Sequence, residues 1–214
     1  LVLVFGGSQG ARSINNAIIG IIENKLNKNY QIIWAAGKGN FENIKQQLAE
    51  KNMDIDNIEN AKIMPYIYNM QEVMETSDLV VSRSGAMTIT EISNLGKPSI
   101  LIPLPNVSQD HQLRNAEVLQ KIGAAQIILN NELEKDILNK EIIEIASNKV
   151  KMKEMGEKER GIRDNCIKVN ELWFQIKMIR VLFYKFWILC LRFLIPETIR
   201  RKRYSPRNYL FYFL

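Results

Sequence analysis

The sequence predicts an α/β fold in which a doubly wound parallel sheet occupies residues 1 to about 150. Short apolar runs alternate with helical patterns along this stretch, and the connections between them are short. Such alternation is typical of a parallel sheet with right-handed crossovers. Several runs, such as 99–102, are continuously apolar, which indicates strands that are buried on both faces.

The expected elements follow one another from the N-terminus. The helix over 86–95 has the clearest end, because Gly96 and then Pro98 are residues that stop a helix. Strands are expected at 1–5, 30–35, 61–64, 79–82, 99–102 and 125–129. Helices are expected at about 11–26, 40–51, 70–76, 86–95, 109–122 and 134–147. A charged segment at 149–164 is interpreted as a solvated helix, with Lys151, Lys153, Glu154, Glu157, Lys158, Glu159 and Arg160 in water.

The net charge of +6 is unevenly distributed along the chain. Residues 1–166 hold 19 Lys and Arg against 21 Asp and Glu, whereas 167–214 hold 10 against 2. The body is therefore nearly neutral, which disfavours a nucleic-acid partner. Two cysteines and a single histidine do not form a disulfide framework or a zinc site. A cytoplasmic location is expected, because the first residues do not have the pattern of a signal peptide.

A glycine-rich turn, GGSQGA at 6–11, directly follows the first expected strand. A helical pattern begins at Arg12, so unpaired backbone N–H groups and the positive end of a helix meet there, which suits a phosphate. The G-x-G-x-x-G spacing is missing, and AAGKG instead of an acidic residue follows the second strand; both facts disfavour a nicotinamide cofactor. The sequence also lacks a Walker motif, which disfavours ATP hydrolysis. For this turn taken alone, a plain tight turn remains the alternative interpretation.

The end of the fourth expected strand has a similar character. Gly85 lets the backbone approach a ligand, and the next helix begins at about Ala86, which makes a second anion site that faces the first. Glu91, one to two turns into that helix, is well placed to accept hydrogen bonds from a ribose diol. A capping or solvated glutamate is the alternative for this residue.

Two further strand ends carry polar or aromatic groups. After the third strand, the segment PYIY at 65–68 offers backbone groups to the edge of a planar base, beside an aromatic ring. After the fifth strand, Gln112 matches sugar hydroxyls, and His111 is better explained as a polar wall or capping residue than as a general base. In open α/β sheets ligands bind at these strand ends. The four loops together fit a diphosphate, a ribose, a base and a polyhydroxyl group, the parts of a nucleoside-diphosphate sugar.

The motifs GGSQGAR, SRSGAMTITE and DHQLRNA are similar, in order and spacing, to those of the MurG family of bacterial peptidoglycan glycosyltransferases. The resemblance is to the family's C-terminal half and covers residues 1 to about 163. It implies a Rossmann-like, UDP-sugar-binding C-terminal domain of a GT-B glycosyltransferase at 1–164. This family moves N-acetylglucosamine from UDP-N-acetylglucosamine to undecaprenyl-pyrophosphoryl-muramoyl-pentapeptide (lipid I) and so produces lipid II. The resemblance implies no cofactor.

The resemblance also implies roles for individual residues. Ser8 would face the diphosphate, Ile67 would pair its backbone with the uracil, and Gln112 would bind the N-acetylglucosamine hydroxyls. Arg83 would support the same cleft. The pyrophosphate and ribose would be held by Ala86, Met87, Thr88, Ile89, Thr90 and Glu91. No metal is expected, because no Asp-x-Asp motif follows a strand. No catalytic residue is assigned, since acceptor recognition, membrane docking and the general base belong to the family's N-terminal domain.

Residues 165–214 do not resemble the family and form a basic, aromatic tail. Over 172–195, four charges stand among 14 Leu, Ile, Val and Phe residues, which disfavours a membrane-spanning helix. An interfacial amphipathic helix, followed by the basic run at 200–203, is favoured. An aggregation-prone or disordered appendage with no selected role is the alternative. The expected location is peripheral, at the cytoplasmic face of the cell membrane.

Two alternative functions stay open on the sequence alone. The chain would be a UDP-sugar-binding subunit if a separate chain supplies the acceptor half, as in other lipid-linked glycosyltransferases. It would instead belong to a glycolipid-forming enzyme if its donor is UDP-glucose or UDP-galactose.

Overall fold

The computed structural model describes residues 1–7, 9–105 and 110–161. The chain divides into two units, Leu1–Asp164 and Asn165–Leu214, and the predicted tail at 165–214 lies outside the described residues. The first unit contains a parallel sheet with the strand order β3-β2-β1-β4-β5-β6. Its strands are β1 (Val2–Phe5), β2 (Ile32–Ala35), β3 (Ala61–Met64), β4 (Leu79–Ser82), β5 (Ser99–Leu101) and β6 (Ala125–Ile127).

β1 lies at the centre of the sheet and has a parallel neighbour on each side. Val2 pairs with Ile32 of β2 and with Leu79 of β4. The chain builds the sheet outward from β1 in one direction and then, from β4, in the other, so the order of winding reverses between β1 and β4. This arrangement confirms the predicted doubly wound sheet.

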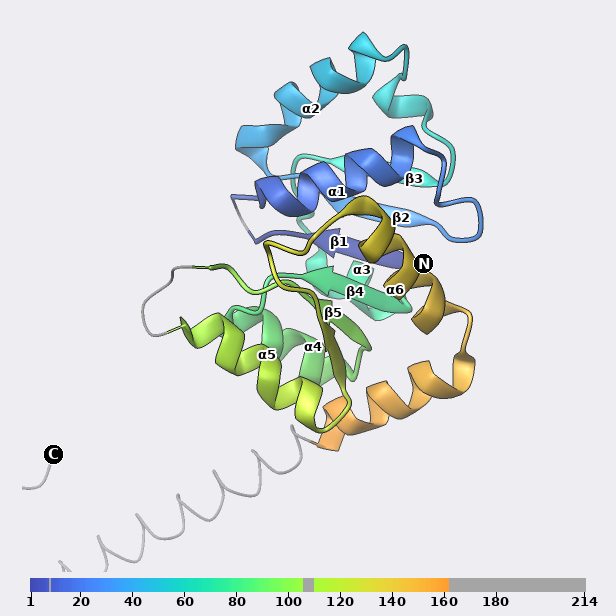
Figure 1. Cartoon of the computed structure of the whole chain (residues 1–214). Coiled ribbons are helices and arrows are strands. Elements are labelled where there is room, and N and C mark those ends of the chain that lie inside the picture. The colour runs from blue at the N-terminus through green and yellow to red at the C-terminus, as the bar shows by residue number, and fades with distance from the viewer. Residues whose placement is uncertain (8, 106–109, 162–214) are drawn as a thin grey trace, which may run out of the picture. The chain divides into compact units, whose positions relative to one another are not determined.

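The helices cover both faces of the sheet (Figure 1). α1, α2 and α6 contribute to one apolar core, and α3, α4 and α5 contribute to the other. The helices are α1 (Arg12–Glu23), α2 (Lys38–Glu50), α3 (Met70–Thr76), α4 (Ala86–Leu95), α5 (His111–Lys121) and α6 (Lys135–Ala146), with a short 3-10 helix η1 (Ile55–Asn57) that the sequence pattern did not predict. All six expected helices are confirmed. None of the described helices is long and apolar enough to cross a membrane.

The start of α1 is tied to the loop after β2 by a buried asparagine. Asn15 Nδ2 donates to the carbonyl oxygen of Ala36 at 2.9 Å, and Asn15 Oδ1 accepts from Trp34 Nε1 at 3.1 Å. Both side chains are buried, so losing either bond would leave a buried polar group unpaired. These bonds fix the first turn of α1, and with it the glycine-rich loop that precedes α1.

A further helix over 149–161 corrects one sequence expectation. The expectation of a solvated helix is wrong for Glu159, which is fully buried and accepts a hydrogen bond from Ser93 Oγ of α4 at 2.7 Å. Gly156 permits this close approach, because a Cβ there would lie 2.6 Å from the carbonyl oxygen of Gly96. Burial raises the pKa of Glu159 from 4.5 to about 7. Charge composition alone could not predict this, since it does not show which helix face packs on the domain.

Candidate functional site

A cleft of about 560 Å³ opens at the carboxyl ends of β1, β4, β5 and β6. It is formed by the loops that follow these strands, and it includes the point where the winding of the sheet reverses. Open α/β sheets bind their ligands at this point, and the volume is in the usual range for a small-molecule site. The lining residues are Gly6, Gly7, Gly10, Ala11, Arg12, Ser13, Arg83, Gly85, Thr88, Leu104, Pro105, Gln112 and Asn130.

The N-termini of α1 and α4 meet at this cleft. Their N-cap residues, Ala11 and Gly85, both line it and have no side-chain oxygen to bind the first amides of the helix. Neither helix has an acidic residue in its first turn. The unpaired N–H groups at the two helix ends give the cleft a positive potential, and no acidic side chain in the first turn of either helix neutralises it. The cleft is therefore suitable for an anion.

Arg83 adds a full positive charge to the same cleft, although its side chain is only 9% exposed. Its Nη1 donates to the carbonyl oxygens of Ile102 and Pro103, at 3.0 and 3.1 Å, and to Asn130 Oδ1 at 2.9 Å. Its Nη2 donates to Ser13 Oγ at 2.9 Å, whereas the buried Nε has no hydrogen-bond partner among the described residues. Burial lowers the pKa of Arg83 below its ordinary value, but arginine stays protonated at neutral pH.

Two of the predicted contact residues line the cleft, namely Thr88 in the first turn of α4 and Gln112 in the first turn of α5. Gln112 Oε1 accepts from the backbone N–H of Leu104 at 3.0 Å, and the Gln112 carbonyl accepts from Ser84 Oγ at 2.7 Å. The side-chain oxygen of Gln112 is therefore used within the protein. Its N–H donors are the atoms to consider for a sugar hydroxyl.

The other predicted contact residues do not line the cleft. Ile67 lies in the irregular segment after β3, is 2% exposed, and packs in the same apolar core as Ile89. Glu91 is exposed on α4, as are Ala86, Met87 and Thr90. Ser8 lies outside the described residues. The structure thus brings Thr88 and Gln112 together at the cleft, and the roles of all the predicted residues toward diphosphate, ribose, base and sugar remain predictions.

An aromatic pair flanks Ile67 in the segment after β3. Tyr66 and Tyr68 meet edge to face, with their ring centroids 5.0 Å apart. Lys38 Nζ, from the start of α2, lies 5.1 Å from the Tyr66 centroid and 5.5 Å from that of Tyr68, within the range of a cation–π contact. The tyrosine rings are on the protein surface, with Tyr68 83% exposed. Ile67, whose backbone is predicted to pair with the base, thus has an aromatic residue on each side of it in the chain.

Asn130 and Ser13 are site residues that the sequence reasoning missed. Asn130 follows β6, and its position directly after an expected strand is the same signal that pointed to the other loops. Ser13 is in the first turn of α1 and carries no motif signal of its own. Its contribution depends on the approach of β4 to β1, which the sequence does not show.

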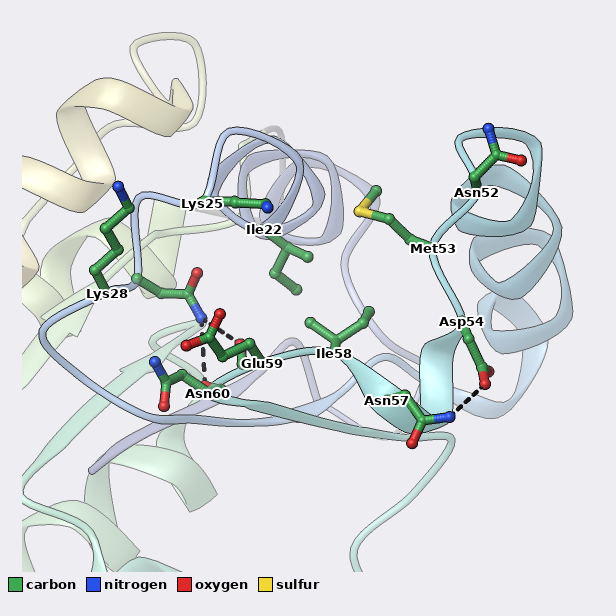
Figure 2. A pocket seen from close by; sticks show the side chains of 11 residues that line it. Ile22, Lys25, Lys28, Asn52, Met53, Asp54, Asn57, Ile58, Glu59 and Asn60 are labelled. Carbon is green, nitrogen blue, oxygen red and sulfur yellow. Dashed lines mark hydrogen bonds between the residues drawn. The ribbon is translucent and has the colours of Figure 1, made fainter.

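A second hollow, of about 280 Å³, lies where α1 and α2 end and β3 begins (Figure 2). Several of its polar groups form hydrogen bonds within the protein. Asn27 Nδ2 donates to the carbonyl oxygens of Glu59 and Asn60, and Asn57 Nδ2 donates to Asp54 Oδ2. It lies at the amino ends of the strands, away from the switch point, so we do not assign a ligand to it.

The strand order and the position of the cleft at the switch point define a Rossmann-like domain. The model of the glycosyltransferase family 28 C-terminal domain matches residues 1–169, and the chain belongs to this family. The crystal structure of Acinetobacter baumannii MurG superposes with a TM-score of 0.62 at 28% identity, over 75% of this chain and 46% of that one. The predicted GT-B fold class and family resemblance are thereby confirmed.

Two relatives carry the same name, UDP-N-acetylglucosamine–N-acetylmuramyl-(pentapeptide) pyrophosphoryl-undecaprenol N-acetylglucosamine transferase. The protein of Bacillus cytotoxicus is 41% identical over 177 residues, which are 82% of this chain and 48% of the relative. The protein of Oenococcus oeni is 39% identical over 178 residues, 82% of this chain and 47% of the relative. The chain spans about half the length of these curated relatives.

Proposed function

We propose that this chain is the donor-binding half of a glycosyltransferase that moves N-acetylglucosamine from UDP-N-acetylglucosamine to lipid I in peptidoglycan synthesis. The observation that carries the proposal is the cleft where two helix N-termini and the buried Arg83 meet. The diphosphate is the negatively charged group of this donor, and the positive potential of the cleft would stabilise it. The names of the relatives supply the sugar and the acceptor.

In this proposal the cleft takes the diphosphate and the sugar of the donor, and neighbouring segments outside the cleft take its base and its ribose. Ser8 and the N-termini of α1 and α4 face the diphosphate, and Glu91 accepts hydrogen bonds from the ribose hydroxyls. The backbone of Ile67 pairs with the uracil, and Gln112 donates to the N-acetylglucosamine hydroxyls. The undecaprenol chain of the acceptor supports work at a membrane surface, and in this proposal the enzyme is a peripheral protein at the cytoplasmic face.

Binding of UDP-N-acetylglucosamine is expected to be independent of divalent metal. The helix N-termini and Arg83 already supply positive charge, and no group of three or more His, Cys, Asp or Glu within the described residues could hold a metal ion. Calorimetric titration with and without a chelator should give the same affinity. A strict requirement for Mg²⁺ or Mn²⁺ would contradict the assignment of the cleft. If UDP-glucose or UDP-galactose binds more tightly than UDP-N-acetylglucosamine in the same titrations, the proposed donor is wrong and that nucleotide sugar takes its place.

Replacing Glu91 by glutamine should weaken UDP binding by about 1.5–3 kcal/mol, because the ribose diol would lose a charged acceptor. Glu50→Gln is the matched control, since this exposed glutamate is the last residue of α2, at the opposite end of the sheet. Calorimetry with UDP checks both variants. An unchanged affinity in Glu91→Gln would show that Glu91 is only a solvated helix residue.

A further inference from the structure

The oxygen atoms that hold the Arg83 guanidinium are all electrically neutral. Two are backbone carbonyls, of Ile102 and Pro103, and two belong to side chains, Asn130 Oδ1 and Ser13 Oγ. The two side chains are also joined to each other, because Ser13 Oγ donates to Asn130 Oδ1 at 2.7 Å. Residues from the first turn of α1 and from the segments after β5 and β6 thus fix one cation that comes from the loop after β4.

A buried cation is ordinarily paired with a carboxylate, because removing a lone charge from water is costly. Among the described residues no carboxylate forms an ion pair with Arg83. Asparagine is nearly isosteric with aspartate, so position 130 is where a minimal change would supply that ion pair. Instead, Asn130 provides the geometry of the hydrogen bond without its negative charge. The charge of Arg83 therefore adds to the two positive helix ends at the same cleft.

We propose that Asn130 and Ser13 are positioning residues that hold Arg83 through neutral oxygens only, so that its charge is kept for the diphosphate of the ligand. This inference rests on the proposed function, which places a diphosphate in the cleft. Asparagine instead of aspartate at position 130 would therefore increase the affinity for the diphosphate ligand and would not increase the stability of the fold. The bound diphosphate would then be the negatively charged partner of Arg83, in place of a carboxylate of the protein.

The test compares Asn130→Asp with Asn131→Asp in the whole chain, using UDP as the probe. Asn131 is the next residue, is exposed, and does not line the cleft, so it controls for an added negative charge nearby. Asn130→Asp should lower the UDP affinity about tenfold or more at low salt, while the urea midpoint of unfolding stays equal or rises. Asn131→Asp should change the affinity less than about threefold, because an exposed charge is screened.

A loss of UDP affinity without a loss of stability separates this role from a structural one. A loss of stability that parallels the loss of affinity would overturn the inference, as would an unchanged affinity or an equal effect in Asn131→Asp. If Asn130→Asp does not fold, Ser13→Ala serves instead, since it removes one neutral anchor and should weaken UDP binding about threefold or more; an unchanged affinity there would also overturn the inference. Failure of the unmodified chain to bind UDP would instead overturn the proposed function.

Discussion

Replacing Gly10 by alanine is expected to destabilise the domain by about 2–5 kcal/mol and to abolish UDP binding. Gly10 has a φ of +73°, a region that L-residues other than glycine enter only with strain. A Cβ at this position would lie 2.3 Å from the carbonyl oxygen of Ala36 and 2.8 Å from Asn40 Nδ2. The glycine-rich loop would have to move away from Ala36, and the first backbone N–H groups of α1 would no longer point into the cleft.

Gly39→Ala is the matched control for this prediction. Gly39 lies in the first turn of α2, and nothing is within 4 Å of a Cβ built on it. Alanine is a better helix former than glycine by about 0.5–1 kcal/mol, so this variant should be as stable as the parent or slightly more stable. Urea unfolding and UDP calorimetry measure both variants. A Gly10→Ala protein with parental stability and affinity would show that the loop does not depend on its close contact with Ala36.

Glu159→Gln is expected to raise the free energy of unfolding by about 2.5 kcal/mol more at pH 8 than at pH 5. Burial raises the pKa of Glu159 from 4.5 in the unfolded chain to about 7 in the folded one. A raised pKa means that the folded state binds the proton more tightly. The contribution of Glu159 to stability is thus complete below about pH 4.5 and is lost as the pH rises to about 7.

Glutamine has the same shape and no charge, so it avoids the cost of an ionised carboxylate in this buried position. The control is Glu157→Gln on the same helix, where the side chain is 59% exposed and lies 3.9 Å from Lys153 Nζ. An exposed ion pair of this kind contributes little, so this variant should shift stability by less than about 1 kcal/mol at either pH. Urea titrations at pH 5 and pH 8 measure the difference in the free energy of unfolding between each of the two variants and the parent protein at each pH. An equal effect of Glu159→Gln at both pH values would contradict the raised pKa.

The elements of the fold could be predicted from the sequence because the strands in the middle of the sheet are short, mainly apolar runs that two covering layers bury. The run at 79–82 is fully buried, as β4, between β1 and β5. The order of the strands could not be predicted in the same way. It depends on which side of β1 each crossover places the next strand, and the periodicity of one segment does not contain that choice.

The site was predictable where glycine or a helix start marks a strand end, as at Gly85, and less so where contacts cross between loops. The hydrogen bond of Arg83 to Asn130 joins residues 47 positions apart. Only the sheet order, with β4 and β6 on either side of β5, makes that meeting possible. Glu159 was misjudged for the same reason, because its burial depends on Ser93 of α4.

The central position of β1 has a consequence for how the chain assembles during synthesis. β1 can pair with β2 once about thirty further residues are made, but its other edge waits for β4, since Val2 pairs with Leu79. At a ribosomal rate of about 5–20 residues per second, that edge stays open for roughly 4–15 s. Within this sheet β1 is thus completed late, and the unpaired backbone N–H and C=O groups along its open edge are the part of the nascent domain most exposed to wrong pairing.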